Sequence, residues 1–180
     1  MKIQSRIRGK QARANGGYFE QLIDRECRKY EDYGLAKIEK TPEPMKPLRR
    51  PNLQGQFLAC YTKHAQPDYK GTLKGGQAVV FEAKHTDADR IEKSRVTDEQ
   101  LSALYAHRDL GAKCFILISF KFERFYRVPI DIWANMERFF KKKSVNENDL
   151  APYRLVYGCH FLGATVSRKD TLWERGSVVV

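Results

Sequence analysis

The sequence predicts an α/β fold in which a mixed central β-sheet is flanked by helices. Its 180 residues suit one domain, and 42% hydrophobic residues supply a core. Helical and strand patterns alternate along the chain, and the apolar run Cys114–Phe120 is typical of a strand covered on both faces. Alternation of this kind indicates a sheet layered with helices.

The chain begins with a basic segment that precedes the first predicted helix. The first 19 residues hold no acid, and their glycines favour a flexible arm over residues 1–14. This arm is either a solvated tail or an element that neutralises a nucleic acid strand. Its cations include Arg6, Arg8, Lys10 and Arg13. From Phe19 to Tyr30 apolar residues recur every three or four positions, which predicts a helix that ends at Gly34.

A proline-rich loop separates the first two predicted strands, Leu35–Glu39 and Gln56–Thr62. Thr41–Gly55 contains four prolines, which forbid a regular helix and a central strand. We therefore expect residues 39–55 to form a projecting loop. The basic residues of this loop are Lys46, Arg49 and Arg50.

A β-hairpin follows the loop. Tyr69–Leu73 and Gln77–Lys84 flank Lys74-Gly75-Gly76, and the two glycines suit a tight turn. A capping-box pattern, Thr97-Asp98-Glu99-Gln100, then predicts the start of a second helix.

The last predicted elements are the strand Phe125–Pro129 and the amphipathic helix Ile130–Lys141. Apolar pieces without a clear period follow. The expected organisation is thus the arm, one domain over residues 15–150, and an extension of unknown role over residues 151–180.

The charge of the chain favours a nucleic acid partner. Thirty-three basic residues face 22 acidic ones, which gives a net charge of +11. No apolar run approaches the roughly 20 residues that span a bilayer, so no membrane segment is expected. The absence of an apolar leader and the four widely spaced cysteines favour a reduced, cytoplasmic chain. No phosphate-binding glycine motif is present, so we expect no nucleotide cofactor.

The hairpin register brings three charged residues together. If the turn is centred on Gly75, Asp68 lies opposite Glu82 on the neighbouring strand. Lys84 lies two residues beyond Glu82 and therefore on the same face of the sheet. We expect these three side chains to converge.

Such a trio suits metal-dependent phosphodiester hydrolysis. Facing carboxylates repel each other unless a cation neutralises them. Mg²⁺ binds one or two carboxylates and completes its coordination with water and phosphate oxygens, and Mn²⁺ is expected to substitute for it. Lys84 would then orient a water or offset charge on the phosphate. The alternative is a solvent-facing bridge between Asp68, Lys84 and Glu82 on an amphipathic strand.

These residues resemble a known family of nucleases. Pro67-Asp68 followed by Glu82-Ala83-Lys84 is the PD-(D/E)XK pattern of restriction-endonuclease-like enzymes. Together with Gly16-x-x-x-Glu20 and the helix that carries Gln100, it resembles the RecU family of Holliday junction resolvases, from about Asn15 to Met136. The resemblance implies a restriction-endonuclease-like fold.

The resemblance also implies an activity and an assembly. RecU-type resolvases are metal-dependent endonucleases that resolve four-way DNA junctions. They act as homodimers that nick two strands of like polarity symmetrically and leave 5′-phosphate and 3′-hydroxyl ends. A homodimer supplies the two symmetric sites that a two-fold junction requires.

The family's functional residues map onto this chain one by one. Asp68, Glu82 and the Ala83 carbonyl would bind the metal, and Lys84 would position water or stabilise charge. Glu20 would be a further acid of the site, or else an exposed acid favoured by the dipole at a helix start. Gln100 would lie near the scissile phosphate, although it already has a structural role in the capping box.

Two regions depart from the family pattern. The family carries a stalk that enters the junction, whereas residues 39–55 of this chain are short and proline-rich. The C-terminal residues match nothing in the family, which suits a diverged, phage-encoded relative. Two other functions therefore stay open: a nuclease that acts on flaps, ends or duplex, and a DNA-binding module without catalysis.

Overall fold

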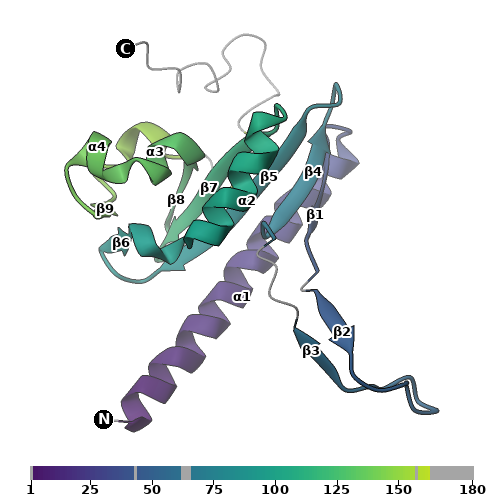
Figure 1. Cartoon of the computed structure of the whole chain (residues 1–180). Helices are drawn as coiled ribbons and strands as arrows, with labels where there is room; N and C mark the ends of the chain where they lie inside the picture. Colours follow the sequence, from purple (N-terminus) through teal and green to yellow (C-terminus); the bar gives the residue numbers. More distant parts are fainter. Residues whose placement is uncertain (1, 43, 62–65, 157, 163–180) are drawn as a thin grey trace.

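The structure is a computed structural model that describes residues 2–42, 44–61, 66–156 and 158–162, with the backbone alone for residues 2–13 and 61. Its centre is a five-stranded sheet in the order β1-β4-β5-β7-β8 (Figure 1). β5 and β7 are parallel, and the other neighbouring strands are antiparallel. The predicted α/β fold with a mixed sheet is confirmed. The strands are β1 (Ala36–Lys40), β4 (Tyr69–Leu73), β5 (Ala78–Thr86), β7 (Lys113–Phe120) and β8 (Arg124–Pro129).

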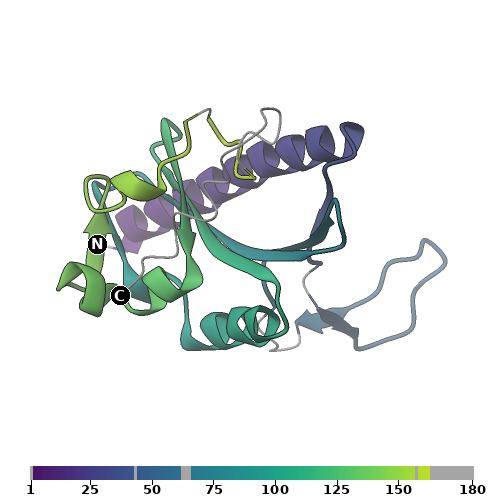
Figure 2. The same ribbon diagram turned by 90° about the horizontal axis from the view of Figure 1, so that it is seen from above.

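Helices cover both faces of the sheet (Figure 2), and each face has its own apolar core. The long helix α1 (Lys2–Asp32) packs on one face through residues such as Phe19 and Ile23. On the other face lie α2 (Asp98–Asp109) and the short helices α3 (Ile130–Ala134) and α4 (Met136–Phe140). α2 is the crossover between the parallel strands β5 and β7, the usual role of a helix in such a connection.

The register of the β4–β5 hairpin agrees with the sequence-based prediction. Tyr69 pairs with Phe81, and Thr72 pairs with Ala78. The turn uses Gly75 and Gly76 at φ of +95° and +90°, the conformation that glycine adopts without steric cost. Gly71 has a different reason to be glycine, because a Cβ atom there would lie 2.2 Å from the Lys37 carbonyl oxygen of β1.

The proline-rich region forms a β-ribbon that projects from the sheet (Figure 1). β2 (Met45–Pro47) pairs with β3 (Ala59–Tyr61) in antiparallel register, and the Leu48 N–H extends the pairing to Leu58. Residues 44–61 are called the ribbon below. The expected projecting segment is therefore present. The strand predicted over Gln56–Thr62 is shorter in the structure, where β3 covers Ala59–Tyr61.

The chain ends differ from the sequence-based expectation. α1 begins at Lys2, so the residues expected to form a flexible arm are helical. The segment contains no proline, and most of its residues are good helix formers, which allows the helix to continue through its glycines. Phe161 is buried against α1 and Arg127 donates to its carbonyl oxygen, so the packed domain continues beyond residue 150. Residues 163–180 of the predicted extension lie outside the described part.

Other local features were not predicted. The helix expected over Ile130–Lys141 is two short helices that meet at Asn135. Two small strands, β6 (Arg90–Glu92) and β9 (Ser144–Asn146), pair with each other, and short 3₁₀ turns occupy Lys93–Arg95 and Ala151–Tyr153. No helix within the described residues is long and apolar enough to span a bilayer.

Candidate active site

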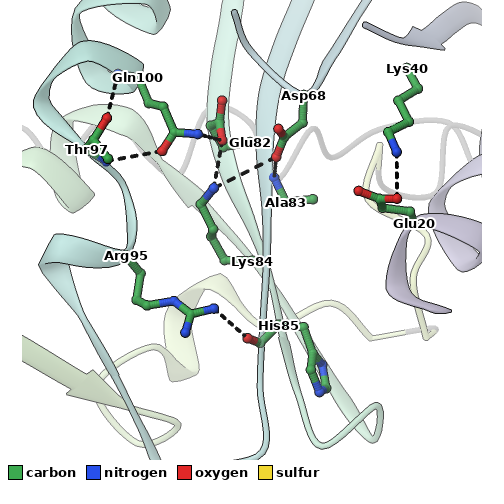
Figure 3. A network of polar contacts seen from close by, with 10 residues as sticks. All are labelled: Glu20, Lys40, Asp68, Glu82, Ala83, Lys84, His85, Arg95, Thr97 and Gln100. Atoms are coloured by element: carbon green, nitrogen blue, oxygen red, sulfur yellow. Dashed lines mark hydrogen bonds and ion pairs between the residues drawn. The ribbon is translucent and has the colours of Figure 1, made fainter. Parts of the chain in front are cut away.

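Glu82 occupies the middle of β5, and its side chain has no exposure to solvent. Its Oε2 accepts hydrogen bonds from Lys84 Nζ at 2.8 Å and from Gln100 Nε2 at 2.6 Å (Figure 3). Its Oε1 is buried and has no hydrogen-bond partner among the described residues. A buried carboxylate oxygen without a donor is costly, which marks this atom as a place for a ligand.

Burial determines the ionisation of Glu82. Loss of solvent raises the pKa of its carboxyl group to about 7; Lys84 opposes this shift, and Asp68 adds to it. A second cation beside Glu82 would favour the charged form. The site is thus prepared for positive charge in addition to Lys84.

Asp68 joins Glu82 from the adjacent strand. It lies directly before β4, where the register continues toward Glu82. Its Oδ2 accepts the Ala83 N–H at 3.0 Å and lies 3.9 Å from Lys84 Nζ. The predicted convergence of Asp68, Glu82 and Lys84 is therefore present in the structure (Figure 3). The alternative of a solvent-facing bridge does not fit, because Glu82 is fully buried.

Gln100 has the capping role that the sequence predicted, and it also contacts Glu82, while its place near the scissile phosphate stays a prediction. Thr97 is the N-cap of α2, and its N–H donates to Gln100 Oε1 at 3.1 Å, while its side chain accepts the Gln100 N–H. Because the amide oxygen is engaged by this capping box, the amide nitrogen faces Glu82 and donates to it. The N-cap of α2 therefore orients a group that holds Glu82.

Glu20 lies apart from this cluster. It projects from α1, and its Oε2 is 2.6 Å from the Nζ atom of Lys40, a bond that raises the pKa of Lys40 (Figure 3). Lys40 pairs with Tyr69 in the β1–β4 ladder and is thus a neighbour of Asp68. The Tyr69 hydroxyl also donates to Asp24 on α1. Sequence reasoning missed Lys40, although extending the hairpin register to β1 would have placed it here.

The residue next to Lys84 faces the other way. His85 packs on the α1 side, where its ring stacks on Phe122 with centroids 3.8 Å apart. Its ring nitrogens contact Ser119 Oγ and Asp87 Oδ1 at 3.1 and 3.0 Å. His85 therefore packs on the sheet face opposite Lys84.

The donor set of the site fits a hard divalent cation. Asp68 and Glu82 offer carboxylate oxygens of the kind that Mg²⁺ prefers, and the unpartnered Glu82 Oε1 is one of them. No group of three or more acidic, histidine or cysteine ligands occurs within the described residues. Magnesium commonly completes its shell with waters and substrate phosphates, so two carboxylates are compatible with it. The Ala83 carbonyl as a further ligand stays a prediction.

The residues predicted to bind DNA lie on projecting parts of the molecule. Lys46, Arg49 and Arg50 are exposed on the ribbon. Figure 1 shows the N-terminal part of α1 extending past the sheet. This part of the helix carries Arg6, Arg8, Lys10 and Arg13.

Comparison with known proteins decides the family. A family model described as RecU, recombination protein U, matches residues 14–159. The match continues past Met136, so the expectation that the C-terminal residues match nothing in the family is wrong up to Cys159. The chain belongs to the RecU family. This family consists of Holliday junction resolvases, so the predictions of a DNA endonuclease and of its family are confirmed.

Two further comparisons complete the picture of this RecU-family chain. A solved structure of Hjc, a Holliday junction resolvase from Archaeoglobus fulgidus, is similar at 12% sequence identity and a TM-score of 0.49. The similarity covers 78% of this chain and 94% of that chain. None of the curated proteins matches the sequence.

Proposed function

We propose that Asp68, Glu82 and Lys84 form a Mg²⁺-dependent active site with which this RecU-family chain nicks four-way DNA junctions. The observation that carries the proposal is the buried Glu82 carboxylate. Its Oε1 has no hydrogen-bond partner in the described part of the chain, and Asp68 and Lys84 lie beside it. The metal, when bound, would polarise the phosphate and supply an activated water. Mn²⁺ is proposed to replace it.

Each residue of the proposed site has a defined role. Glu82 and Asp68 hold the cation, with the Ala83 carbonyl as an additional ligand. Lys84, only 14% exposed, offsets the negative charge that develops on the phosphate oxygens or orients the attacking water. Gln100 holds the Glu82 carboxylate in one orientation.

Glu20 has a conditional role in this proposal. Its carboxylate is paired with Lys40, so it serves the site only when substrate or metal draws it away from that lysine. We propose it as an additional acid of the loaded site.

We also propose an assembly and a DNA path, which the symmetry of a four-way junction and the exposed cations support. Two copies related by a two-fold axis would place two sites on a symmetric junction and make paired nicks. The ribbon, with Lys46, Arg49 and Arg50, and the basic start of α1 would contact the branches. Since its substrate is cellular DNA, we propose that the protein acts in the cytoplasm.

Cleavage of labelled DNA tests this function. Four-way junction, linear duplex and flap DNA are incubated with the protein in Mg²⁺ and in EDTA. We expect paired symmetric nicks in the junction, lost in EDTA and in Asp68→Asn, and retained in the control Glu39→Gln, an exposed acid on β1. Cutting of duplex or flaps alone would reject junction specificity, and binding without cutting under any divalent ion would reject the catalytic site.

A further inference from the structure

The ribbon and the proposed active site are joined at one point of the sheet. The last pair of the β1–β4 ladder is Lys40 with Tyr69. One step further, where the chain leaves β1 for the ribbon, the Thr41 N–H donates to the Asp68 carbonyl oxygen at 2.8 Å. The residue at which the chain leaves the sheet is thus bonded to the residue that carries a proposed metal ligand.

The two carboxylates of the site are held with different firmness. Glu82 is in the middle of β5, and its neighbour in register on β7 is Ile116. Asp68 lies beyond the last β4–β5 pair, and its side chain is 33% exposed. The hydrogen bonds from Ala83 to its carboxylate and from Thr41 to its carbonyl fix its position. A shift of Thr41 would therefore move Asp68 relative to Glu82.

The same step of the chain also contacts the second acid. Lys40, directly before Thr41, pairs with Glu20 on α1 at 2.6 Å. Figure 3 shows the Lys40–Glu20 pair beside Asp68. Lys40, the last residue of β1, and Thr41, directly after it, therefore contact Glu20 and Asp68 respectively.

The ribbon carries exposed side chains that a partner can contact. It projects from the sheet, and it exposes apolar side chains next to its cations, among them Met45, Leu48 and Phe57 with 58%, 56% and 51% of their surface accessible. Thr41, which precedes the ribbon by three residues in the chain, is bonded to Asp68.

We propose that Thr41 is a positioning residue that couples occupancy of the ribbon to the placement of Asp68. This inference rests on the proposed function. A junction that engages the ribbon holds the Thr41–Asp68 bond in place and keeps the Asp68 carboxylate in register with Glu82. A linear duplex that does not reach the ribbon leaves Asp68 less constrained. Selectivity for branched DNA then arises in kcat as well as in affinity.

Paired substitutions at Thr41 test the coupling. Thr41→Pro removes the N–H donor, and Lys40 before it is extended, as a residue before proline prefers. Thr41→Val keeps the N–H and replaces a buried hydroxyl for which the described residues offer no hydrogen-bond partner. For Thr41→Pro we expect kcat on the junction to fall at least about tenfold, with the junction Kd within about twofold of wild type. The kcat of Thr41→Val on the junction should be at least about fivefold higher than that of Thr41→Pro. Equal kcat for the two variants, or a loss in Kd alone, would overturn the coupling.

A measurement on the wild-type protein covers the case in which Thr41→Pro does not fold. The Ala83 amide donates to Asp68, so its NMR shift reports the position of that carboxylate, and exchange of the Thr41 amide reports the bond at the base of the ribbon. In EDTA, binding of a four-way junction should slow hydrogen exchange of the Thr41 amide and change the chemical shift of the Ala83 amide. Linear duplex bound to the same extent should change neither. Equal responses to both DNAs would reject the proposal.

Failure of the coupling is separable from failure of the proposed function. If Asp68→Asn cuts junctions as fast as wild type, the site assignment fails. If Asp68→Asn is inactive and the Thr41 variants are alike, the site stands and the coupling alone is rejected.

Discussion

The two faces of β5 use the same strand for different purposes. On the α2 face, Glu82 and Lys84 are charged groups held by Gln100 and Asp68. On the α1 face, Phe81 and His85 make aromatic contacts. The ring of Phe81 stacks on that of Phe115 with centroids 4.8 Å apart, and the ring of His85 stacks on Phe122. Alternation of side chains along a strand makes this separation possible, since residues one apart point to opposite faces. One face is therefore expected to determine activity, and the other stability.

Substitution of two adjacent residues is the most direct test of this division. Lys84→Ala removes the cation beside the proposed metal site, and we expect junction cleavage to fall by at least about 100-fold, with little loss of fold. His85→Ala removes the stack on Phe122 and should lower the free energy of unfolding by about 1–3 kcal/mol, with cleavage largely kept. Cleavage rates and denaturant unfolding of both variants would show the contrast. If His85→Ala lost cleavage while Lys84→Ala cleaved as fast as wild type, the division between the two faces would be contradicted.

The pH dependence of stability is the next largest expected effect. The pKa of Glu82 is about 7 in the folded protein, above its ordinary value, so the folded state holds a proton that unfolding releases. In EDTA the free energy of unfolding should therefore fall by about 3 kcal/mol between about pH 4.5 and pH 7, and level off above that range. Glu82→Gln should lack this component, while the control Glu39→Gln should keep it. Identical pH profiles for wild type and Glu82→Gln would show that burial does not control this carboxyl group.

Two substitutions at Gln100 separate its helix-capping role from its role at the site. Gln100→Glu keeps an acceptor for the Thr97 N–H, which preserves the capping box, but it removes the donor to Glu82. We expect cleavage to fall about 10- to 100-fold, and repulsion between the new carboxylate and Glu82 to lower the thermal stability although the capping box is kept. Gln100→Ala loses both bonds and should lose stability by about 1 kcal/mol as well. Full activity in Gln100→Glu would limit this residue to helix capping.

The smallest expected effect is on stability, and it concerns the turn that contains Lys121 and Phe122, whose ring stacks on His85. Lys121 and Phe122 have φ of +52° and +58°, which side chains other than asparagine and glycine adopt at a cost. Lys121→Asn and Lys121→Ala both lose the exposed ion pair with Asp89 and differ in tolerance of this conformation. Asn should be more stable than Ala by about 0.5–1 kcal/mol, with equal cleavage rates. A stability difference of opposite sign would show that the turn does not store strain.

Local patterns were sufficient for the elements with strong signals. The hairpin register followed from two glycines and strand alternation, and with it the placement of Asp68, Glu82 and Lys84. The capping box at Thr97 and Gln100 was readable for the same reason, because the hydrogen bonds involved span only three residues. The extension of α1 to Lys2 was not predicted, because its glycines favour flexibility although the residues around them are good helix formers. The break at Asn135 was not predicted either.

What the sequence by itself determined is therefore the local chemistry: the α/β pattern, the trio on one face of a hairpin, and the positive charge that suits DNA. The tertiary structure decided how distant residues meet. It buried Glu82 beneath α2, turned Gln100 toward it, paired Glu20 with Lys40, and bonded Thr41 at the base of the ribbon to Asp68. The physical reason is range: turn geometry and strand alternation act over a few residues, whereas burial and contacts between α1, β1 and β4 depend on how the whole sheet packs.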